Sequence, residues 1–439
     1  MKLESDIAIV APRRTPFAQI GKGLAEYTSI QLGKLVGETV IASSGLDKSK
    51  IDGVVVGEGL PQDLNPARVI SELIGLPHEA TAVIASNNCV SGMEAAAEAA
   101  RRIHLGEGEI FLVIGQESQT HIPFIIRNAR TSSKTNSVAK LQKTLPDNLP
   151  EGIEIRDSLE DGLGDRPVSV GMAVTAEILA QKFQLKREST DHVAIESFKR
   201  MAAAHAAGVY KPYVIPVPRA QDDDLRVDEA VELRKGLVEN PERMARAQLI
   251  FDNAAMKFED FKKRYSEYLS DTHGATVSIF SASARSDGAA GMLMMKRSKA
   301  EQLGLPVVGI LRGWHMKGVP PEFMGLGQSR SVMGLLDDTG LDVNDVDYIE
   351  IHEAFAATAV AALEELRLER GLDWRKRFDA GKINPHGGSI AAGHPFGATG
   401  VRLIINAIMN LEKDAGAKRV IATACAGDGV GGSLLIERP

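Results

Sequence analysis

The chain contains two cysteines, and the first of them, Cys89, stands where a nucleophile could be activated. It follows the apolar run 81–85, which is typical of a buried strand, and precedes an Ala-rich segment of strong helix formers. The polar triplet 86–88 predicts the N-cap of that helix and places Cys89 at or near its first turn. Backbone N–H groups and the helix dipole favour an anion there, so we expect a lowered pKa for the thiol. A small buried core cysteine is the alternative interpretation.

The elements around Cys89 alternate between strand and helix patterns. Apolar, β-branched runs predict strands, and apolar residues at helical spacing predict a helix over 29–43. The predicted strands are 7–10, 51–56, 81–85 and 109–115. This alternation indicates an α/β fold with a largely parallel, covered sheet.

Length and composition restrict the class of protein. The 439 residues exceed one ordinary domain, and 44% hydrophobic content with a net charge of −7 predicts a soluble globular protein without affinity for nucleic acid. No apolar run approaches the ~18 residues that span a bilayer. The chain enters its first strand directly, so we expect neither a signal nor a transit peptide. Two cysteines exclude a disulfide scaffold, and a reducing cytoplasm fits best.

The middle of the chain, 118–276, is more charged and has longer loops, which predicts an inserted lid or substrate-binding region. Helical patterns cover 173–183, 191–206 and 241–268. Its first part, 118–146, has no acidic residue. A solvated surface loop, phosphate binding, a partner contact and a membrane contact all remain open for it. Its basic residues are Arg127, Arg130, Lys134, Lys140 and Lys143.

An internal repeat links the two ends of the chain. Residues 44–58 align without gaps on 339–353, with a shared Gly-Leu-Asp, a matching apolar alternation and a terminal Glu. Further on, the four residues from Cys89 match the four from His394, and each set opens a predicted helix. Two copies of one α/β unit with an insertion between them explain this pattern.

The repeat predicts a catalytic pair. If the halves pack about a pseudo-two-fold axis, the helix N-termini bearing Cys89 and His394 face one pocket. An imidazole then accepts the thiol proton and the thiolate attacks a carbonyl. Three further stretches, 352–356, 384–395 and 423–429, follow predicted strands of the second half, where sites in α/β proteins lie. No His/Cys/carboxylate cluster has metal-ligand spacing, so no metal site is expected.

The motifs together resemble those of the thiolases, the acetyl-CoA acetyltransferases and 3-ketoacyl-CoA thiolases. The resemblance covers nearly the whole chain, and the wording is closest to the β-subunit of fatty-acid oxidation (trifunctional) complexes. It rests on Cys89 after its polar triplet, His352-Glu353-Ala354-Phe355, the run 387–400, Cys425 before a glycine loop, 13–17 and 286–290. It implies two repeated α/β halves in a layered αβαβα core with an inserted loop domain.

The resemblance implies a role for each site residue. Cys89 is the implied nucleophile, His394 its base, and Cys425 a second acid/base at the α-carbon of acetyl-CoA. His352, with a held water and His394, would form one oxyanion site. The backbone N–H groups of Cys89 and Gly427 would form the other. Fixed donors of this kind are each worth ~10²–10³ in rate.

The implied reaction is CoA-dependent cleavage of a 3-ketoacyl-CoA, or the reverse Claisen condensation, through an acyl-enzyme. CoA is then a substrate, and no tightly bound cofactor is expected. A homodimer or homotetramer is implied, with an enoyl-CoA hydratase/hydroxyacyl-CoA dehydrogenase subunit as a further partner. The alternatives are a related condensing synthase and a non-catalytic acyl-CoA-binding protein. The expected domains are 1–117 with 277–304, 118–276, and 305–439.

Two stretches depart from the thiolase pattern. The loop after Cys425 carries a carboxylate, Asp428, which would place negative charge near an oxyanion site unless it points away. The segment 276–283 lacks the family's usual wording, although Ser283 is still expected to contact the pantetheine arm of CoA. Both departures bear on substrate range more than on reaction class.

Overall fold

The computed structural model describes most of the chain. The described residues are 2–131, 137, 139–141, 153–165, 170–238, 240, 242, 246–252, 256–269 and 273–439. Two of the five basic residues noted in the stretch 118–146, Lys134 and Lys143, lie outside this set.

One large mixed sheet forms the centre of the molecule. Its strands run in the order β12-β13-β14-β11-β1-β10-β5-β3-β4, and the short β2 pairs with β10. The predicted strands 7–10, 51–56, 81–85 and 109–115 all lie within or overlap strands of this sheet. The strands are β1 (Lys2–Arg14), β2 (Ala18–Gln19), β3 (Gly53–Gly57), β4 (Thr81–Ala85), β5 (Ile110–Ser118), β10 (Ser286–Lys296), β11 (Val307–Gly318), β12 (Tyr348–Ile351), β13 (Arg419–Ala426) and β14 (Val430–Glu437).

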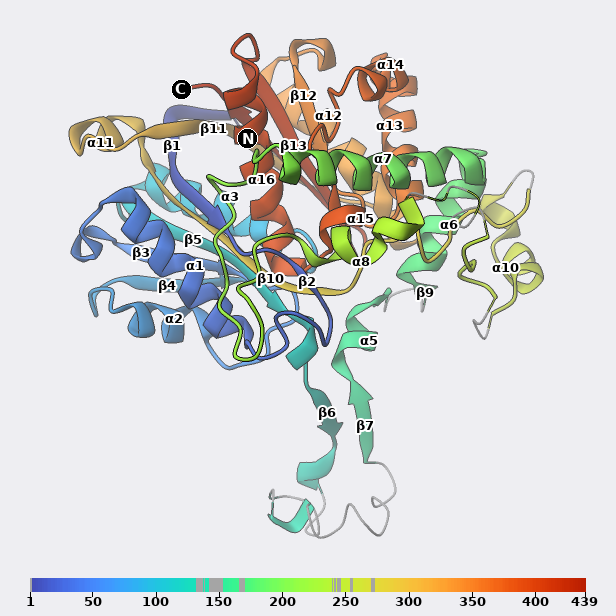
Figure 1. The fold of residues 1–439 in the computed structure, drawn as a ribbon, viewed down its shortest axis with the longest axis horizontal. Coiled ribbons are helices and arrows are strands. Elements are labelled where there is room, and N and C mark those ends of the chain that lie inside the picture. Colours follow the sequence, from blue (N-terminus) through green and yellow to red (C-terminus); the bar gives the residue numbers. More distant parts are fainter. Residues whose placement is uncertain are drawn as a thin grey trace.

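Helices divide this sheet into layers. α3 (Ser91–Leu105) and α16 (Phe396–Lys413) pack on each other and lie between the two halves of the sheet (Figure 1). α1 (Ser29–Ser44) and α2 (Pro66–Ile74) cover the outer face of the first half. α12 (Gly327–Thr339) covers the second half and packs on α13 (Ala356–Arg370). The αβαβα layering predicted from the sequence is therefore confirmed.

The apolar runs explain why the strands are covered on both faces. Every residue of β5 is buried, and its side chains alternate between two core clusters. Phe111 and Val113 face the inner cluster with α3 and α16, whereas Ile110, Leu112 and Ile114 face the outer one. A strand buried on both faces needs a continuous apolar run, which is the pattern that the sequence shows.

The repeat appears as the same local structure in both halves. α1 and α12 each end at a left-handed glycine, Gly45 and Gly340. A short 3₁₀ turn follows in each half, η1 (Lys48–Lys50) capped by Asp47 and η7 (Val343–Asp345) capped by Asp342. β3 and β12 come next, and each pairs in parallel with the strand that follows the central helix of its half. The two repeats thus meet at the antiparallel pair β1–β11.

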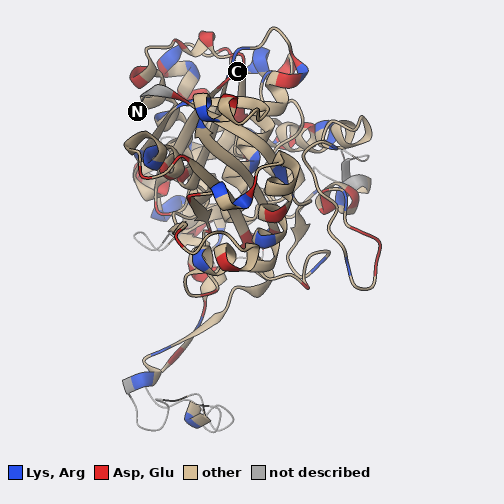
Figure 2. Ribbon diagram, turned by 90° about the vertical axis from the view of Figure 1, so that its left-hand side faces the viewer, with Lys and Arg blue, Asp and Glu red and all other residues tan. Residues whose placement is uncertain are grey.

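The region between the halves contains a projecting hairpin and several helices. β6 (Phe124–Arg127) pairs with β7 (Glu154–Asp157) and extends away from the body (Figure 1). Residues coloured as Lys or Arg occur along this projection (Figure 2), where Arg127, Arg130 and Lys140 are exposed. The remaining elements are η2 (Gln119–His121), η3 (Ala129–Thr131), α5 (Ser158–Gly162), β8 (Gly164–Asp165), β9 (Val170–Gly171), α6 (Met172–Lys182), α7 (Arg187–Ala206), α8 (Glu229–Val238), α10 (Phe258–Arg264) and η5 (Ser266–Tyr268).

Two of the three helices predicted in this region are present. α6 and α7 match 173–183 and 191–206. Of the helix predicted over 241–268, the described residues confirm the part that forms α10, whereas residues 246–252 are not helical. Ile250 N–H donates instead to the Val277 carbonyl, and Ile279 N–H donates to the Gln248 carbonyl. These contacts with a distant segment replace the local helical hydrogen bonds.

The short elements of the second half complete the fold. They are α11 (Arg297–Gln302), η6 (Pro321–Leu326), α14 (Trp374–Asp379) and α15 (Ser389–Ala392). Among the helices of the described residues, none has the length and apolar character needed to cross a membrane. The division into three domains with the boundaries given above stays a prediction.

Candidate active site

The two central helices bring the predicted pair together. Cys89 lies two residues before the start of α3, and His394 lies two residues before the start of α16. Both line a cavity of about 450 Å³ that Cys425 and Gly427 also line. Apolar side chains make up much of the remaining wall, among them Leu163, Met172, Ile250, Ile279, Met324, Phe355 and Phe396.

A tight turn presents Cys89 to this cavity. Asn88 has a positive φ of 45°, and Ser91 Oγ accepts from Asn87 N–H (2.8 Å) while it donates to the Asn88 carbonyl (2.7 Å). The N-cap is Val90, with no side-chain cap. The prediction that the polar triplet 86–88 caps the helix is therefore wrong, since a first-turn serine fixes the turn instead.

The predicted lowering of the Cys89 pKa is also wrong. Burial raises the pKa of the Cys89 thiol, and nearby Cys425 raises it further. The backbone N–H groups of Gly427 and of Cys89 itself act in the opposite direction, but they do not compensate for the lost solvation. The resting site therefore holds a neutral thiol, which needs a base at the moment of reaction.

His394 is held so that one ring nitrogen faces the cavity. Its backbone N–H donates to the Ala284 carbonyl (2.9 Å), and its carbonyl accepts from Gln119 Nε2 (3.1 Å). Its Nδ1 lies 2.7 Å from Thr399 Oγ1, whereas Nε2 is buried and has no protein partner in the described structure. Burial, and then the charge of Arg402, lower the pKa of His394 to about 3, so the ring is neutral.

His352 joins the pair from the end of β12. Its ring centroid lies 4.2 Å from that of His394, and its Nδ1 lies 2.7 Å from Ser389 Oγ. Burial lowers the pKa of His352 well below the usual value, and the charges of His394 and Arg402 lower it further. His352 is thus a second neutral imidazole beside the thiol.

Cys89, His352 and His394 form a tighter cluster than sequence spacing suggested. One sulfur and two nitrogen atoms lie within 4.8 Å of one another, close enough to hold a metal ion. The sequence predicted no metal cluster because the three residues are far apart in the chain. Burial, and to a lesser extent the charge of Arg402, lower the pKa of both imidazoles, so both rings are neutral and suited to proton transfer.

Cys425 supplies the second thiol. It lies in β13, and Gln328 Nε2 donates a hydrogen bond to its sulfur (3.0 Å). Burial raises the pKa of Cys425 to about 12, and the bond from Gln328 partly offsets this effect. Gln328 comes from the first turn of α12, so only the fold places it beside the thiol.

The structure shows which groups surround the Asp428 carboxylate, which the sequence places next to a predicted oxyanion site. Asp428 adopts a left-handed backbone (φ 64°), and its carboxylate accepts from Asn88 Nδ2 at 3.3 Å. The same Nδ2 donates to the Gly427 carbonyl at 3.2 Å. Asp428 lines a separate small cavity of about 150 Å³ with Arg127, not the main cavity. Asp428 is therefore not part of the wall of the main cavity, where the predicted oxyanion donors lie.

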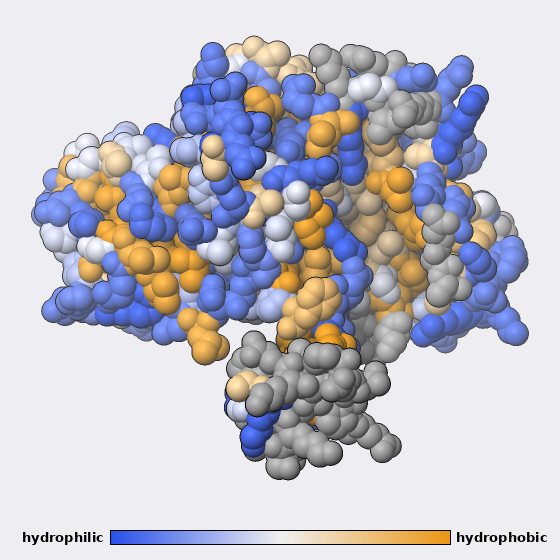
Figure 3. Space-filling model, turned by 60° about the horizontal axis from the view of Figure 1, so that its bottom comes forward, coloured by the Kyte–Doolittle hydropathy of each residue, from blue (hydrophilic) through white to orange (hydrophobic). Residues whose placement is uncertain are grey.

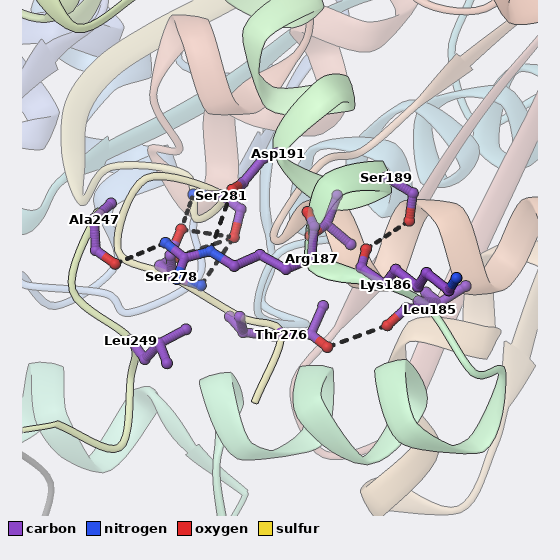
Figure 4. Close-up of polar contacts among 12 residues, drawn as sticks. Leu185, Lys186, Arg187, Ser189, Asp191, Ala247, Leu249, Thr276, Ser278 and Ser281 are labelled. Carbon is purple, nitrogen blue, oxygen red and sulfur yellow. Dashed lines mark hydrogen bonds and ion pairs between the residues drawn. The ribbon is translucent and has the colours of Figure 1, made fainter. Parts of the chain in front are cut away.

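The departing segment 276–283 forms one wall of the cavity. Ser283 lines it and donates from Oγ to the Ala354 carbonyl at 3.0 Å. Upstream, Thr276 Oγ1 donates to the Leu185 carbonyl, and Arg187 reaches the Ala247 carbonyl (Figure 4). The bond from Thr276 joins the segment to the residues just before α7, and the backbone bonds at Val277 and Ile279 join it to residues 246–252. The inserted region therefore shapes this wall.

A buried carboxylate ties the two halves together behind the site. Glu117 accepts backbone N–H groups from Gly59, Leu60 and Gly397, the last in the first turn of α16. Burial raises the pKa of Glu117 to about 8 and that of neighbouring Glu58 to about 7. This pair was not predicted from the sequence, because Glu58 and Glu117 each stand at the end of an ordinary apolar strand.

The residues that hold the two histidines were not predicted from the sequence either. Thr399 follows His394 by five residues in the glycine-rich run, so its position in the first helical turn could have indicated a contact. Ser389 and Arg402 carry no such local signal, because they meet His352 only through the fold.

This fold and this site define a class of protein. A thiol and a neutral imidazole stand at the N-termini of two paired helices, and a second imidazole and a second thiol come from the end of β12 and from β13. Together these groups make an acyltransferase that works through a thioester. The comparisons with known proteins agree. Residues 7–256 match the thiolase N-terminal domain and residues 305–438 match the thiolase C-terminal domain. The chain therefore belongs to the thiolase family.

Relatives and solved structures cover the whole chain. An acetyl-CoA acetyltransferase of Chromobacterium violaceum is 32% identical over 99% of this chain and 100% of its own length. The peroxisomal 3-ketoacyl-CoA thiolase B of Rattus norvegicus is 30% identical over 99% of this chain and 91% of its own. Human mitochondrial 3-ketoacyl-CoA thiolase in complex with CoA superimposes with a TM-score of 0.82 at 26% identity, covering 100% of this chain and 99% of that one.

Proposed function

We propose that this thiolase-family acyltransferase cleaves 3-ketoacyl-CoA with CoA, or runs the reverse condensation, through an acyl group on Cys89. The observation that carries the proposal is the meeting of the Cys89 sulfur with His394 and His352 nitrogens within 4.8 Å. Cys425 lines the same cavity, so both thiols that the reaction needs are available to one substrate.

The first half of the reaction forms the acyl-enzyme. His394 Nε2 takes the proton of Cys89, and the thiolate attacks the 3-keto carbon. The N–H groups of Cys89 and Gly427 stabilise the oxyanion. The C2–C3 bond then breaks, and the enolate of acetyl-CoA takes the proton of Cys425. His352 and His394 face the enolate oxygen in this arrangement.

The second half returns the enzyme to its resting state. Incoming CoA gives its thiol proton to the Cys425 thiolate and attacks the acyl carbon. As Cys89 leaves, it recovers its proton from His394. Every group thus ends as it began, and a ping-pong order follows from the covalent intermediate.

The substrate is proposed to be an acyl-CoA of moderate size, with CoA a substrate and no resident cofactor. The largely apolar cavity favours an acyl chain, and a solved relative binds CoA. We keep Ser283 as a pantetheine contact. Within the basic stretch 118–146, Arg127 is the residue that we propose contacts a phosphate of CoA, because it lines the small cavity. Neutralising Arg127 should then raise the KM for CoA.

A homo-oligomer is proposed on two features of the surface. β4 pairs only with β3 among the described strands, and most of its side chains are partly exposed, so the prediction of a fully buried strand is wrong there. Leu73, on the neighbouring α2, and Leu64, just before α2, are exposed, and apolar patches interrupt the hydrophilic surface in Figure 3. A hydratase/dehydrogenase subunit is a further proposed partner. The proposed location is the cytoplasm, because its reducing conditions suit two free thiols.

Thiolysis of acetoacetyl-CoA tests the proposed activity. Loss of the enolate absorbance should require CoA and should vanish in Cys89→Ala. An active Cys89→Ala protein would overturn the proposal. Acyl transfer to Cys89 without CoA-dependent cleavage would indicate a related condensing synthase, and CoA binding without acyl-Cys89 a binding protein. Asp428 gives little support to the latter, since its carboxylate turns toward Asn88.

A further inference from the structure

The two neighbouring histidines of the site, His352 and His394, differ in the direction of the hydrogen bond at their Nδ1 atoms. Each Nδ1 lies 2.7 Å from a hydroxyl oxygen, Ser389 Oγ for His352 and Thr399 Oγ1 for His394. Each Nε2 is buried and has no protein partner in the described residues. A neutral imidazole carries one hydrogen, so the direction of the Nδ1 hydrogen bond decides whether Nε2 donates or accepts.

The contact of His394 makes its Nε2 an acceptor. Thr399 Oγ1 donates to the Pro395 carbonyl, one helical turn earlier, at 2.9 Å. A hydroxyl has one hydrogen, so Thr399 must accept from His394. The ring hydrogen is then on Nδ1, and the lone pair of Nε2 faces the Cys89 thiol.

The contact of His352 has the opposite direction. Ser389 Oγ accepts from Arg402 Nη2 at 2.8 Å, and a guanidinium only donates. Arg402 and Ser389 are both fully buried. Within the described chain the Ser389 hydroxyl hydrogen has one acceptor, His352 Nδ1. If His352 donated instead, that hydrogen would stay buried without a partner, which is costly.

We propose that Arg402 and Ser389 act as positioning residues that hold His352 as a permanent Nε2–H donor, opposite the Nε2 acceptor that Thr399 maintains on His394. This inference rests on the proposed function and deepens it. One ring stabilises the enolate oxygen whatever the charge on the other, while the other moves the proton of Cys89. The two imidazoles thus have separate tasks although they lie side by side.

The proton balance of the reaction supports this separation. During cleavage His394 already carries the proton taken from Cys89, whereas Cys425 supplies the proton for the enolate carbon. A donor that never gives up its hydrogen must then hold the enolate oxygen throughout. His352 meets this need only in the Nε2–H form.

Nuclear magnetic resonance of the whole protein tests the tautomers directly. Isotope-labelled histidines report which ring nitrogen carries hydrogen, and His352→Gln and His394→Gln assign the two signals. We expect hydrogen on Nε2 of His352 and on Nδ1 of His394. The same tautomer on both rings, or the reverse assignment, would overturn the proposal whether or not the protein catalyses thiolysis.

Kinetics of the Ser389→Ala variant test the consequence. We expect exchange of the α-hydrogens of acetyl-CoA with solvent, which reports the enolate, to slow by roughly tenfold or more, while acetylation of Cys89 stays near the wild-type rate. Ser71→Ala removes another buried serine hydroxyl, on α2, and serves as the matched control. Equal slowing of both steps, or of neither, would refute the role of Ser389. A wild-type protein without either step would instead refute the proposed function.

Discussion

The contact between the two central helices fixes the distance between Cys89 and His394, and one glycine tests it. A Cβ atom at Gly92 of α3 would lie 2.4 Å from the Gly397 carbonyl oxygen and 3.0 Å from Val401 N, both on α16. A normal contact is about 1 Å longer, so Gly92→Ala must push the helices apart by a comparable amount. Overpacking of this kind costs about 1–3 kcal/mol of folding free energy.

The same displacement acts on the reaction, because each helix carries one partner at its N-terminus. A misplacement of about 1 Å can cost ~10² in rate. We therefore expect Gly92→Ala to lower kcat for thiolysis of acetoacetyl-CoA by about two orders of magnitude, with a lowered Tm and a much smaller change in KM. Gly318→Ala is the matched control, since a Cβ there meets no atom within 4 Å. A folded Gly92→Ala enzyme with wild-type kcat would refute the argument.

Three further perturbations give distinct outcomes. Gln328→Ala removes the donor to Cys425, so α-hydrogen exchange of acetyl-CoA should slow by roughly tenfold while acetylation persists; unchanged exchange would contradict this. Asp428→Asn should leave kcat within about twofold, because the carboxylate lies outside the main cavity, and a larger change would place it at the site. Glu58 and Glu117 stay protonated to higher pH in the folded state, where their pKa values are about 7 and about 8, than in an unfolded chain, where the usual value is 4.5. Their contribution to stability is full below pH 4.5 and is lost as pH rises through the folded values. Glu58→Gln should therefore flatten the fall of Tm between pH 4.5 and about 7, and parallel curves would contradict it.

The pairing of Cys89 with His394 could be predicted because the internal repeat is visible in the sequence itself. The repeat aligns the two helix starts, and an α/β fold brings equivalent helix N-termini together. The apolar runs similarly predicted the central strands, since burial on both faces demands such runs. The environment of Cys89 could not be predicted in this way. Its raised pKa comes from burial and from Cys425, both consequences of tertiary packing.

The residues that hold His352 and Cys425 could not be predicted from the sequence for the same reason. Ser389 and Arg402 meet at His352 from separate places in the chain, and Gln328 reaches Cys425 from another helix. The helix expected over 241–268 does not include residues 246–252, because these residues pair with a distant segment. Secondary-structure propensity depends on neighbouring residues and therefore cannot predict contacts that form only when the chain folds.

The most direct test of the account is incubation with acetyl-CoA, acid quenching and peptide mass mapping. We predict one acetyl group on Cys89, which CoA removes with formation of acetyl-CoA, and no label on that peptide in Cys89→Ala. An acetyl group on Cys425 alone, or bound CoA with no acylated cysteine, would contradict the assignment of Cys89 as the nucleophile.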